Sequence, residues 1–145
     1  MRKRPKLRFA EWSGRHLGKA YVLGLNDCLS LAIDFCEHVG IEVPDEFEGV
    51  TRDGYASFYK EAPGTAFRIF CRWIATIADR IDPAFIFTGD LMIVRPKSDG
   101  ETKGEMVVIH SGGDRIMGAF HNLGRIDYSS VRAYDILRAY RLKRS

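Results

Sequence analysis

The hydrophobic pattern of the chain predicts helices in its first half and strands in its second. Between residues 26 and 40, apolar side chains recur at steps of three and four, which is the spacing of one face of a helix. Asn26 or Asp27 is a suitable N-cap for this helix, and Gly40 supplies its C-terminal stop. The apolar positions of the segment are Leu31, Ala32, Phe35, Cys36 and Val39.

Two further helices are expected before the pattern changes. A short helix over residues 55–60 is followed by the helix-breaking pair Pro63-Gly64, and an amphipathic helix covers residues 67–81. The apolar face of the second of these helices is formed by Phe67, Phe70, Ile74 and Ile77.

After Asp82-Pro83, short apolar runs are separated by turn residues, a pattern that is typical of strands. The run Gly112-Gly113-Asp114 between two such segments indicates a β-hairpin. The expected extended segments cover residues 84–87, 91–94, 106–109, 115–120 and, as one or two strands, 131–142.

Helices that precede antiparallel strands imply an α+β domain, in which N-terminal helices pack on an antiparallel sheet or half-barrel. A length of 145 residues suits one domain with its own core. No repeat or linker interrupts the sequence. We therefore expect a basic N-terminal arm over residues 1–19 and a single domain over residues 20–145.

Composition narrows the class of protein further. The chain is 46% hydrophobic and 28% charged, and it has no apolar run that approaches the roughly 18 residues of a membrane helix. No apolar segment follows the basic N-terminus, so we expect a protein made in the cytoplasm without a signal peptide. Because Cys28, Cys36 and Cys71 lack the spacing of zinc ligands, neither a metal nor a cofactor is expected.

Cys28 is the residue most suited to chemistry. It lies in the first turn of the predicted helix over residues 26–40, where free backbone N–H groups and the helix dipole favour a thiolate. A cysteine in that position acquires a lowered pKa and becomes a nucleophile. The alternative is a small buried residue at a helix start, because free cysteine is among the most buried residue types.

Three motifs in order resemble the NlpC-type cell-wall peptidases, which have a papain-like fold. Tyr21 to Cys28 (Tyr-Val-Leu-Gly-Leu-Asn-Asp-Cys) is similar to the segment in which an Asp-Cys pair opens the nucleophile helix of that family. Thr88-Gly89-Asp90-Leu91 is similar to the family's Pro-Gly-Asp-Leu strand, and the hairpin over residues 106–119 to its next two strands. The resemblance spans residues 20–142 and implies an NlpC-type domain with Cys28 as nucleophile.

The resemblance does not fix the catalytic base. When the hairpin turns are aligned, the family's histidine falls on Met106 and its orienting residue near Gly118, and neither side chain accepts a proton. A shift of four residues makes His110 the base and His121 or Asn122 its orienting group. In that alignment the strand after the base has a turn composition, and His110 lies roughly 13 Å beyond the position of Met106.

Two functions stay open at this point. The resemblance implies either a phage tail component, at the tail tip or hub, that serves as a structural or assembly module, or an active cysteine hydrolase that cleaves peptidoglycan stem-peptide amides. The expected partners are other virion and tail proteins, with peptidoglycan as the alternative. Basic residues gather at both ends of the chain, but no aromatic stacking pattern accompanies them, so nucleic acid is not the expected partner. The basic residues of the C-terminal cluster are Arg138, Arg141, Lys143 and Arg144.

Overall fold

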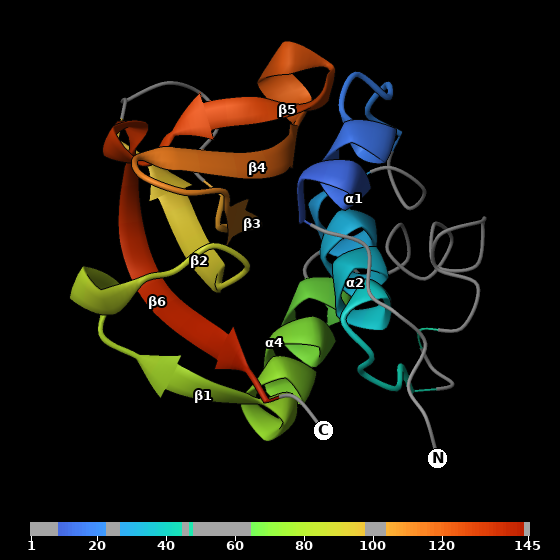
Figure 1. The fold of residues 1–145 in the computed structure, drawn as a ribbon, viewed down its shortest axis with the longest axis vertical. Helices are drawn as coiled ribbons and strands as arrows, with labels where there is room; N and C mark the ends of the chain where they lie inside the picture. Colours follow the sequence, from blue (N-terminus) through green and yellow to red (C-terminus); the bar gives the residue numbers. More distant parts are fainter. Residues whose placement is uncertain (1–8, 23–26, 45–46, 48–64, 98–103, 144–145) are drawn as a thin grey trace.

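The structure, a computed structural model, describes residues 9–22, 27–44, 47, 65–97 and 104–143. Within these residues it is an α+β protein, in which helices lie together beside a curved antiparallel sheet (Figure 1). The helices are α1 (Phe9–His16), α2 (Cys28–His38) and α4 (Thr65–Ile77). The strands are β1 (Ala78–Ile81), β2 (Leu91–Pro96), β3 (Met106–His110), β4 (Arg115–Phe120), β5 (Arg125–Ser130) and β6 (Tyr134–Leu142). Short 3-10 helices join them: η2 (Pro83–Phe85), η3 (His121–Leu123) and η4 (Val131–Ala133).

The six strands have the order β1-β6-β2-β3-β4-β5, so β1 and β5 are the two edge strands. β4 pairs with β5 along its whole length, but its register with β3 includes only the pairs Ile109–Met117 and His110–Ile116. The first half of β3 therefore pairs with β2 and separates from β4. On the outer edge of β5, the segment after α1 forms a bridge from Ala20 to Arg125.

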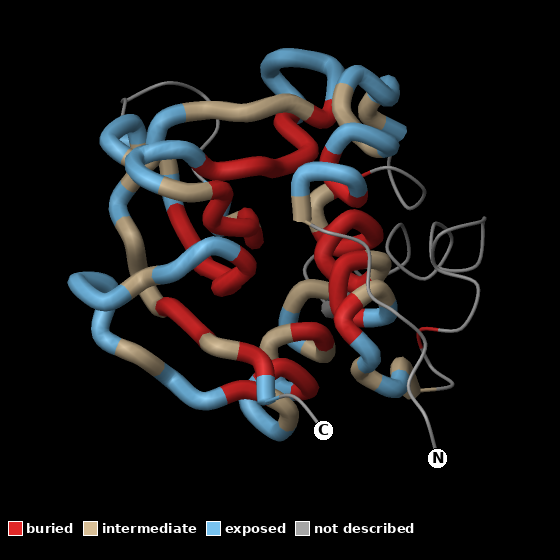
Figure 2. The backbone as a smooth tube through the Cα atoms, viewed as in Figure 1, coloured by how far each residue is buried: buried red, intermediate tan, exposed pale blue. Residues whose placement is uncertain are grey.

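Two hydrophobic clusters lie on opposite faces of the sheet, because side chains alternate along each strand. The larger cluster fills the space between the helices and the sheet, and Figure 2 shows burial concentrated there. The smaller cluster covers the other face. Its buried members are Met92, Val94, Val108, Ile116, Phe120 and Ala139.

Helix α1 is fixed to α2 through one carboxylate. Trp12 is fully buried, and its Nε1 donates a hydrogen bond to Asp34 Oδ2 over 3.1 Å. His16 Nε2 lies 2.7 Å from the same oxygen, and its ring packs 4.8 Å from the indole. Trp12 is thus a packing residue, and the expected basic arm contains a helix packed on the domain.

Asp34→Asn is expected to lower the thermal unfolding temperature at neutral pH by a few degrees, a cost of about 1 kcal/mol. Burial opposes ionisation of Asp34, but the hydrogen bonds from His16 and Trp12 outweigh it and hold the pKa of the carboxyl below 3.8. Because this folded-state pKa is depressed, the stabilisation is present above 3.8 and is lost as pH falls through the folded value.

Thermal denaturation of the wild type and the variant at neutral pH and at about pH 3 checks this linkage. Asp135→Asn, at an exposed position of β6, is the matched control and should change little. A difference between wild type and Asp34→Asn that is equally large at the two pH values would contradict the assignment.

The structure confirms the α+β class and the predicted helix from Cys28, which has Asp27 as N-cap and Gly40 at positive φ after its end. The predicted helix over residues 67–81 is wrong at its C-terminal end, because Ala78–Ile81 pairs with β6 as strand β1. Residues 84–87 are not a strand: the carboxylate of Asp82 accepts the Ala84 N–H and caps η2. The expected helix over residues 55–60 lies outside the described residues.

The later strands follow the predictions more closely. β2, β3 and β4 begin where the sequence places them, and the closing segment contains one strand, β6, preceded by η4. Strand β5 was not expected. In the described part of the chain, no helix combines the length and the apolar character needed to cross a bilayer.

Candidate functional site

Local sequence fixes the position of Cys28 at the first residue of α2. The Asp27 carboxylate accepts the Ser30 N–H, and the Ser30 hydroxyl accepts the Asp27 N–H, so the two residues form a reciprocal capping box. Both residues are buried. As predicted, Asp27 caps the helix, and this leaves the thiol of Cys28 at the end of α2 that faces β3.

The thiol of Cys28 is held in its protonated form. Burial, followed by the negative charge of Asp27, raises the pKa of Cys28 from an ordinary value of 9.0 to about 12. Hydrogen bonds from the backbone N–H groups of Val107, Cys28 and Leu29 lower it in part. The helix start therefore supplies the donors that a thiolate needs, but desolvation and Asp27 outweigh them.

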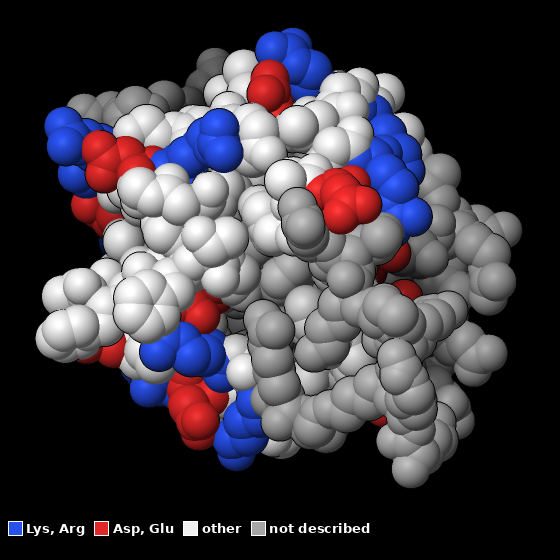
Figure 3. Space-filling view, in the orientation of Figure 1, with Lys and Arg blue, Asp and Glu red and all other residues white. Residues whose placement is uncertain are grey.

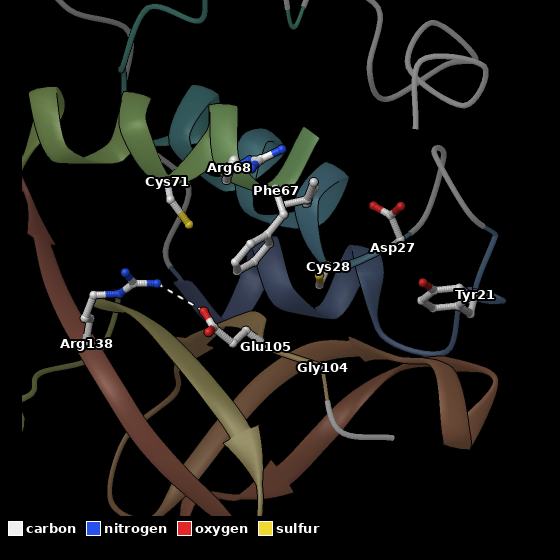
Figure 4. Close-up of a pocket in the computed structure, with 10 residues that line it drawn as sticks. Tyr21, Asp27, Cys28, Phe67, Arg68, Cys71, Gly104, Glu105 and Arg138 are labelled. Carbon is white, nitrogen blue, oxygen red and sulfur yellow. Dashed lines mark hydrogen bonds and ion pairs between the residues drawn. The ribbon is translucent and has the colours of Figure 1, made fainter. Parts of the chain in front are cut away.

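Cys28 lies on the wall of a pocket of about 540 Å³ between the helices and the sheet (Figure 4). α2 and α4 form one side of the pocket, and the start of β3 and the middle of β6 form the other. The lining residues are Tyr21, Asp27, Cys28, Leu29, Phe67, Arg68, Cys71, Gly104, Glu105 and Arg138. This volume falls in the usual range of ligand sites.

Met106, onto which the aligned histidine falls, lies on the sheet face away from the pocket. The Met106 side chain packs against the smaller cluster, on the sheet face away from the helices. Glu105 lines the pocket instead, and Val107 belongs to the cluster beneath the helices. A side chain one residue along a strand lies on the other face, so the pocket receives Glu105 and not Met106 from this strand end. Gly118 shares the face of Val108, whose Cγ1 would lie 3.1 Å from a Cβ at position 118.

An ion pair crosses the pocket floor. Arg138 on β6 donates from its NH2 group to Glu105 Oε1 over 3.2 Å, and both side chains are partly exposed (Figure 4). Cys71 of α4 is half-buried and lines the same pocket. Burial raises the pKa of the Cys71 thiol, the Arg138 charge lowers it, and the Glu105 charge raises it. The second thiol of the pocket therefore also remains protonated at neutral pH.

His110 does not reach Cys28. It lies on the same strand face as Met106, and its buried ring is bound to the β3–β4 turn, with Nε2 2.8 Å from Gly113 O. Because a carbonyl oxygen only accepts, Nε2 is the donor of this hydrogen bond. His110 lies three residues along β3 from Val107, which contacts the thiol. His110 is therefore a residue of the hairpin turn and not of the pocket.

His121 and Asn122 lie in η3 and are exposed. His121 is five residues beyond Ile116, the β4 partner of His110, which is a separation of roughly 16 Å along a strand. The His121 ring instead packs edge-on against Tyr21 at 5.2 Å, outside the pocket wall. The structure thus does not bring the predicted base and its orienting group together.

All four histidines of the chain lie among the described residues, and none lines the pocket. His16 pairs with Asp34, and the His38 ring packs 6.0 Å from Trp12 at the far end of α2. Nor do the described residues contain a group of three or more His, Cys, Asp or Glu arranged to hold a metal ion. The pocket therefore has a cysteine at a helix N-terminus without a histidine beside it.

The sequence does not predict which residues of α4, β3 and β6 lie beside Cys28 in the pocket. Arg138 was read as part of a basic C-terminal cluster, but it pairs with Glu105, and Arg141 of the same cluster pairs with the buried Asp90. Phe67 and Cys71 carried only the signal of an apolar helix face. No local pattern could place these residues beside Cys28, because the strand pairing of β6 with β2 brings Arg138 there.

Comparison with known proteins adds no relative. No protein-family model matches the chain, and a comparison with curated proteins finds no significant match.

Proposed function

We propose that the chain is a phage tail component with an NlpC-like fold, which acts as a structural or assembly module and does not use Cys28 as a nucleophile. The main argument against catalysis is that the Cys28 thiol is protonated and that none of the four histidines lines its pocket. A cysteine hydrolase needs a base within hydrogen-bond reach of the thiol, directly or through one water.

The placement in a phage tail rests on the sequence resemblance. The arrangement of the helix that opens with Asp27-Cys28 against antiparallel strands supports the NlpC-like part of the proposal. In the proposed module, residues at catalytic positions of the resemblance have structural roles. Asp27 caps α2, and His110 forms a hydrogen bond with the β3–β4 turn.

A hydrolysis assay tests the proposal. Purified protein incubated with peptidoglycan sacculi is expected to release no soluble stem-peptide fragments above background, measured by mass spectrometry. Cys28→Ala should behave like the wild type, and Cys71→Ala, at the same pocket wall, is the matched control. Release of fragments by the wild type that only Cys28→Ala abolishes would establish the hydrolase instead.

The tail assignment needs a separate measurement. When the chain is produced together with the proteins of a phage tail, we expect it to co-purify with assembled tail particles. Wild type and Cys28→Ala should be incorporated equally, because the thiol has no chemical role in assembly. Absence of the chain from purified tail particles would overturn the tail assignment and leave the assay for hydrolysis unaffected.

One observation favours the hydrolase as a second candidate. The backbone N–H groups of Val107, Cys28 and Leu29 lie near enough to the Cys28 sulfur to lower the pKa of its thiol. Such donors also stabilise the oxyanion of acyl transfer. With the thiol protonated, these donors alone supply no nucleophile, so the assembly module remains the function that the pocket supports best.

A further inference from the structure

Two phenyl rings protrude from the loop between β1 and β2. Phe85 is 66% exposed and Phe87 is 65% exposed, the two highest values among the exposed large hydrophobic residues of the described chain. We call residues 83–87 the aromatic tip. Figure 3 shows it as an uncharged protrusion at the left, at the place of η2 in Figure 1. Exposed aromatic anchors of this kind mark interaction sites more often than isolated surface residues do.

The aromatic tip is rigidly supported by Arg141. The guanidinium of Arg141 lies 4.6 Å from the centre of the Phe87 ring and donates to Phe85 O over 2.8 Å. It also forms two hydrogen bonds with the carboxylate of Asp90, at 3.1 and 2.8 Å. Asp90 Oδ2 in turn accepts the Phe87 N–H. The backbone of the aromatic tip and the Phe87 ring are therefore held in place, which reduces the entropy lost on binding.

The pocket beside Cys28 offers a concave surface of matching size. A cavity of roughly 150 Å³ holds one benzene ring, so two phenyl groups need about 300 Å³. The pocket volume is about 540 Å³, and Leu29, Phe67 and Tyr21 supply apolar and aromatic walls. A pair of rings thus fits without displacing the Glu105–Arg138 ion pair from the floor.

The charges at the two surfaces are complementary. Asp82, at the base of the aromatic tip, is exposed, and its described contact is the helix cap to the Ala84 N–H. Arg68 is exposed at the rim of the pocket, and no described side chain forms an ion pair with it. Figure 4 shows its guanidinium on the helix side of the pocket, away from the sheet. An aromatic tip seated in the pocket would bring these opposite charges to the same rim.

The tip and the pocket of one chain lie on opposite faces of the sheet. Ile86, between the two phenylalanines, packs against the smaller cluster, whereas the pocket lies on the helix side. A contact between them must therefore join two copies. We propose that the aromatic tip of one copy inserts into the Cys28 pocket of a second copy, so that the chain self-associates head to tail. Such a contact uses two different surfaces and leaves one of each free for further copies.

Sedimentation velocity from low micromolar to millimolar protein tests the inference. We expect the average sedimentation coefficient to rise with concentration, and Phe85→Ser/Phe87→Ser to weaken the association by about tenfold or more. Arg68→Glu should weaken it as well. Leu123→Ser and Arg72→Glu, an exposed apolar position and an exposed cation of α4 outside the pocket wall, are the matched controls and should associate normally.

A mixture of the tip variant (Phe85→Ser/Phe87→Ser) with Arg68→Glu distinguishes this contact from any other mode of association. The tip variant keeps an intact pocket, and Arg68→Glu keeps an intact tip, so their mixture should form a 1:1 complex that neither forms alone. Thermal melting of each variant shows that it is folded. A wild type that stays monomeric over the whole range, a tip variant that still associates, or controls that lose association equally would each overturn the inference. None of these outcomes bears on whether Cys28 is catalytic.

Discussion

Cys28 in the folded protein is expected to react with iodoacetamide far more slowly at neutral pH than an ordinary cysteine. A thiol with a pKa of about 12 holds about 10³-fold less thiolate at neutral pH than one with a pKa of 9.0, and the thiolate is the nucleophile. Peptide mapping by mass spectrometry after timed alkylation distinguishes Cys28 from Cys36 and Cys71. The alkylation rate should rise steadily through the alkaline range. Its pH dependence reports the ionisation of the thiol, whereas its absolute value also depends on how easily the reagent reaches the sulfur.

Two substitutions identify the cause of the slow reaction. Asp27→Asn removes the charge that raises the pKa of Cys28 and retains a good N-cap, so the pH profile should move to lower pH while α2 stays intact. His110→Gln should leave the profile unchanged, because its ring is bound to Gly113. A plateau of reactivity near neutral pH that disappears in His110→Gln would show a working dyad and refute the assignment of Cys28 as an inert thiol.

Trp12→Ala is expected to destabilise the folded protein severely. The indole is fully buried, packs 4.9 Å from the Phe35 ring, and donates to Asp34. Removal of a buried Trp side chain costs about 3–5 kcal/mol, which is a large part of the total stability of a domain. Thermal unfolding followed by circular dichroism should show a midpoint roughly 10 °C lower or more.

Trp12→Phe serves as the control, since it keeps a ring in the site and loses only the hydrogen bond to Asp34. It should cost less than half as much as Trp12→Ala. If α1 were a loosely attached arm, both substitutions would leave the midpoint near that of the wild type. This comparison therefore tests directly whether residues 9–16 belong to the folded domain.

The sequence allows the prediction of elements whose ends are marked by local chemistry. α2 begins at Asp27 because its side chain caps the helix, and the chain turns at Gly40, which adopts a positive φ. The β3–β4 hairpin turns at Gly112 and Gly113, both at positive φ, as their composition indicates. These signals act within a few residues, so the sequence alone contains them.

Elements that depend on distant partners could not be predicted. The apolar period of α4 runs on past Ile77, yet pairing with β6 turns Ala78–Ile81 into a strand. The same non-local pairing decided the site: Cys28 was found from its place at a helix start, but Glu105 and Arg138 meet only in the assembled sheet. The sequence also could not show which face of the sheet Met106 occupies, because a shift of one residue in a strand moves a side chain to the other face.

The charged residues of the edge strand β1 disfavour its pairing with the β1 strand of a second copy. Two copies that paired through β1 about a two-fold axis would place side chains of the same face opposite each other, so that Asp79 would meet Asp79 or Arg80 would meet Arg80. Like charges directly opposite destabilise a strand pair. β1 therefore protects the molecule from edge-to-edge aggregation into a continuous sheet, and a substitution that neutralised both positions would remove this protection.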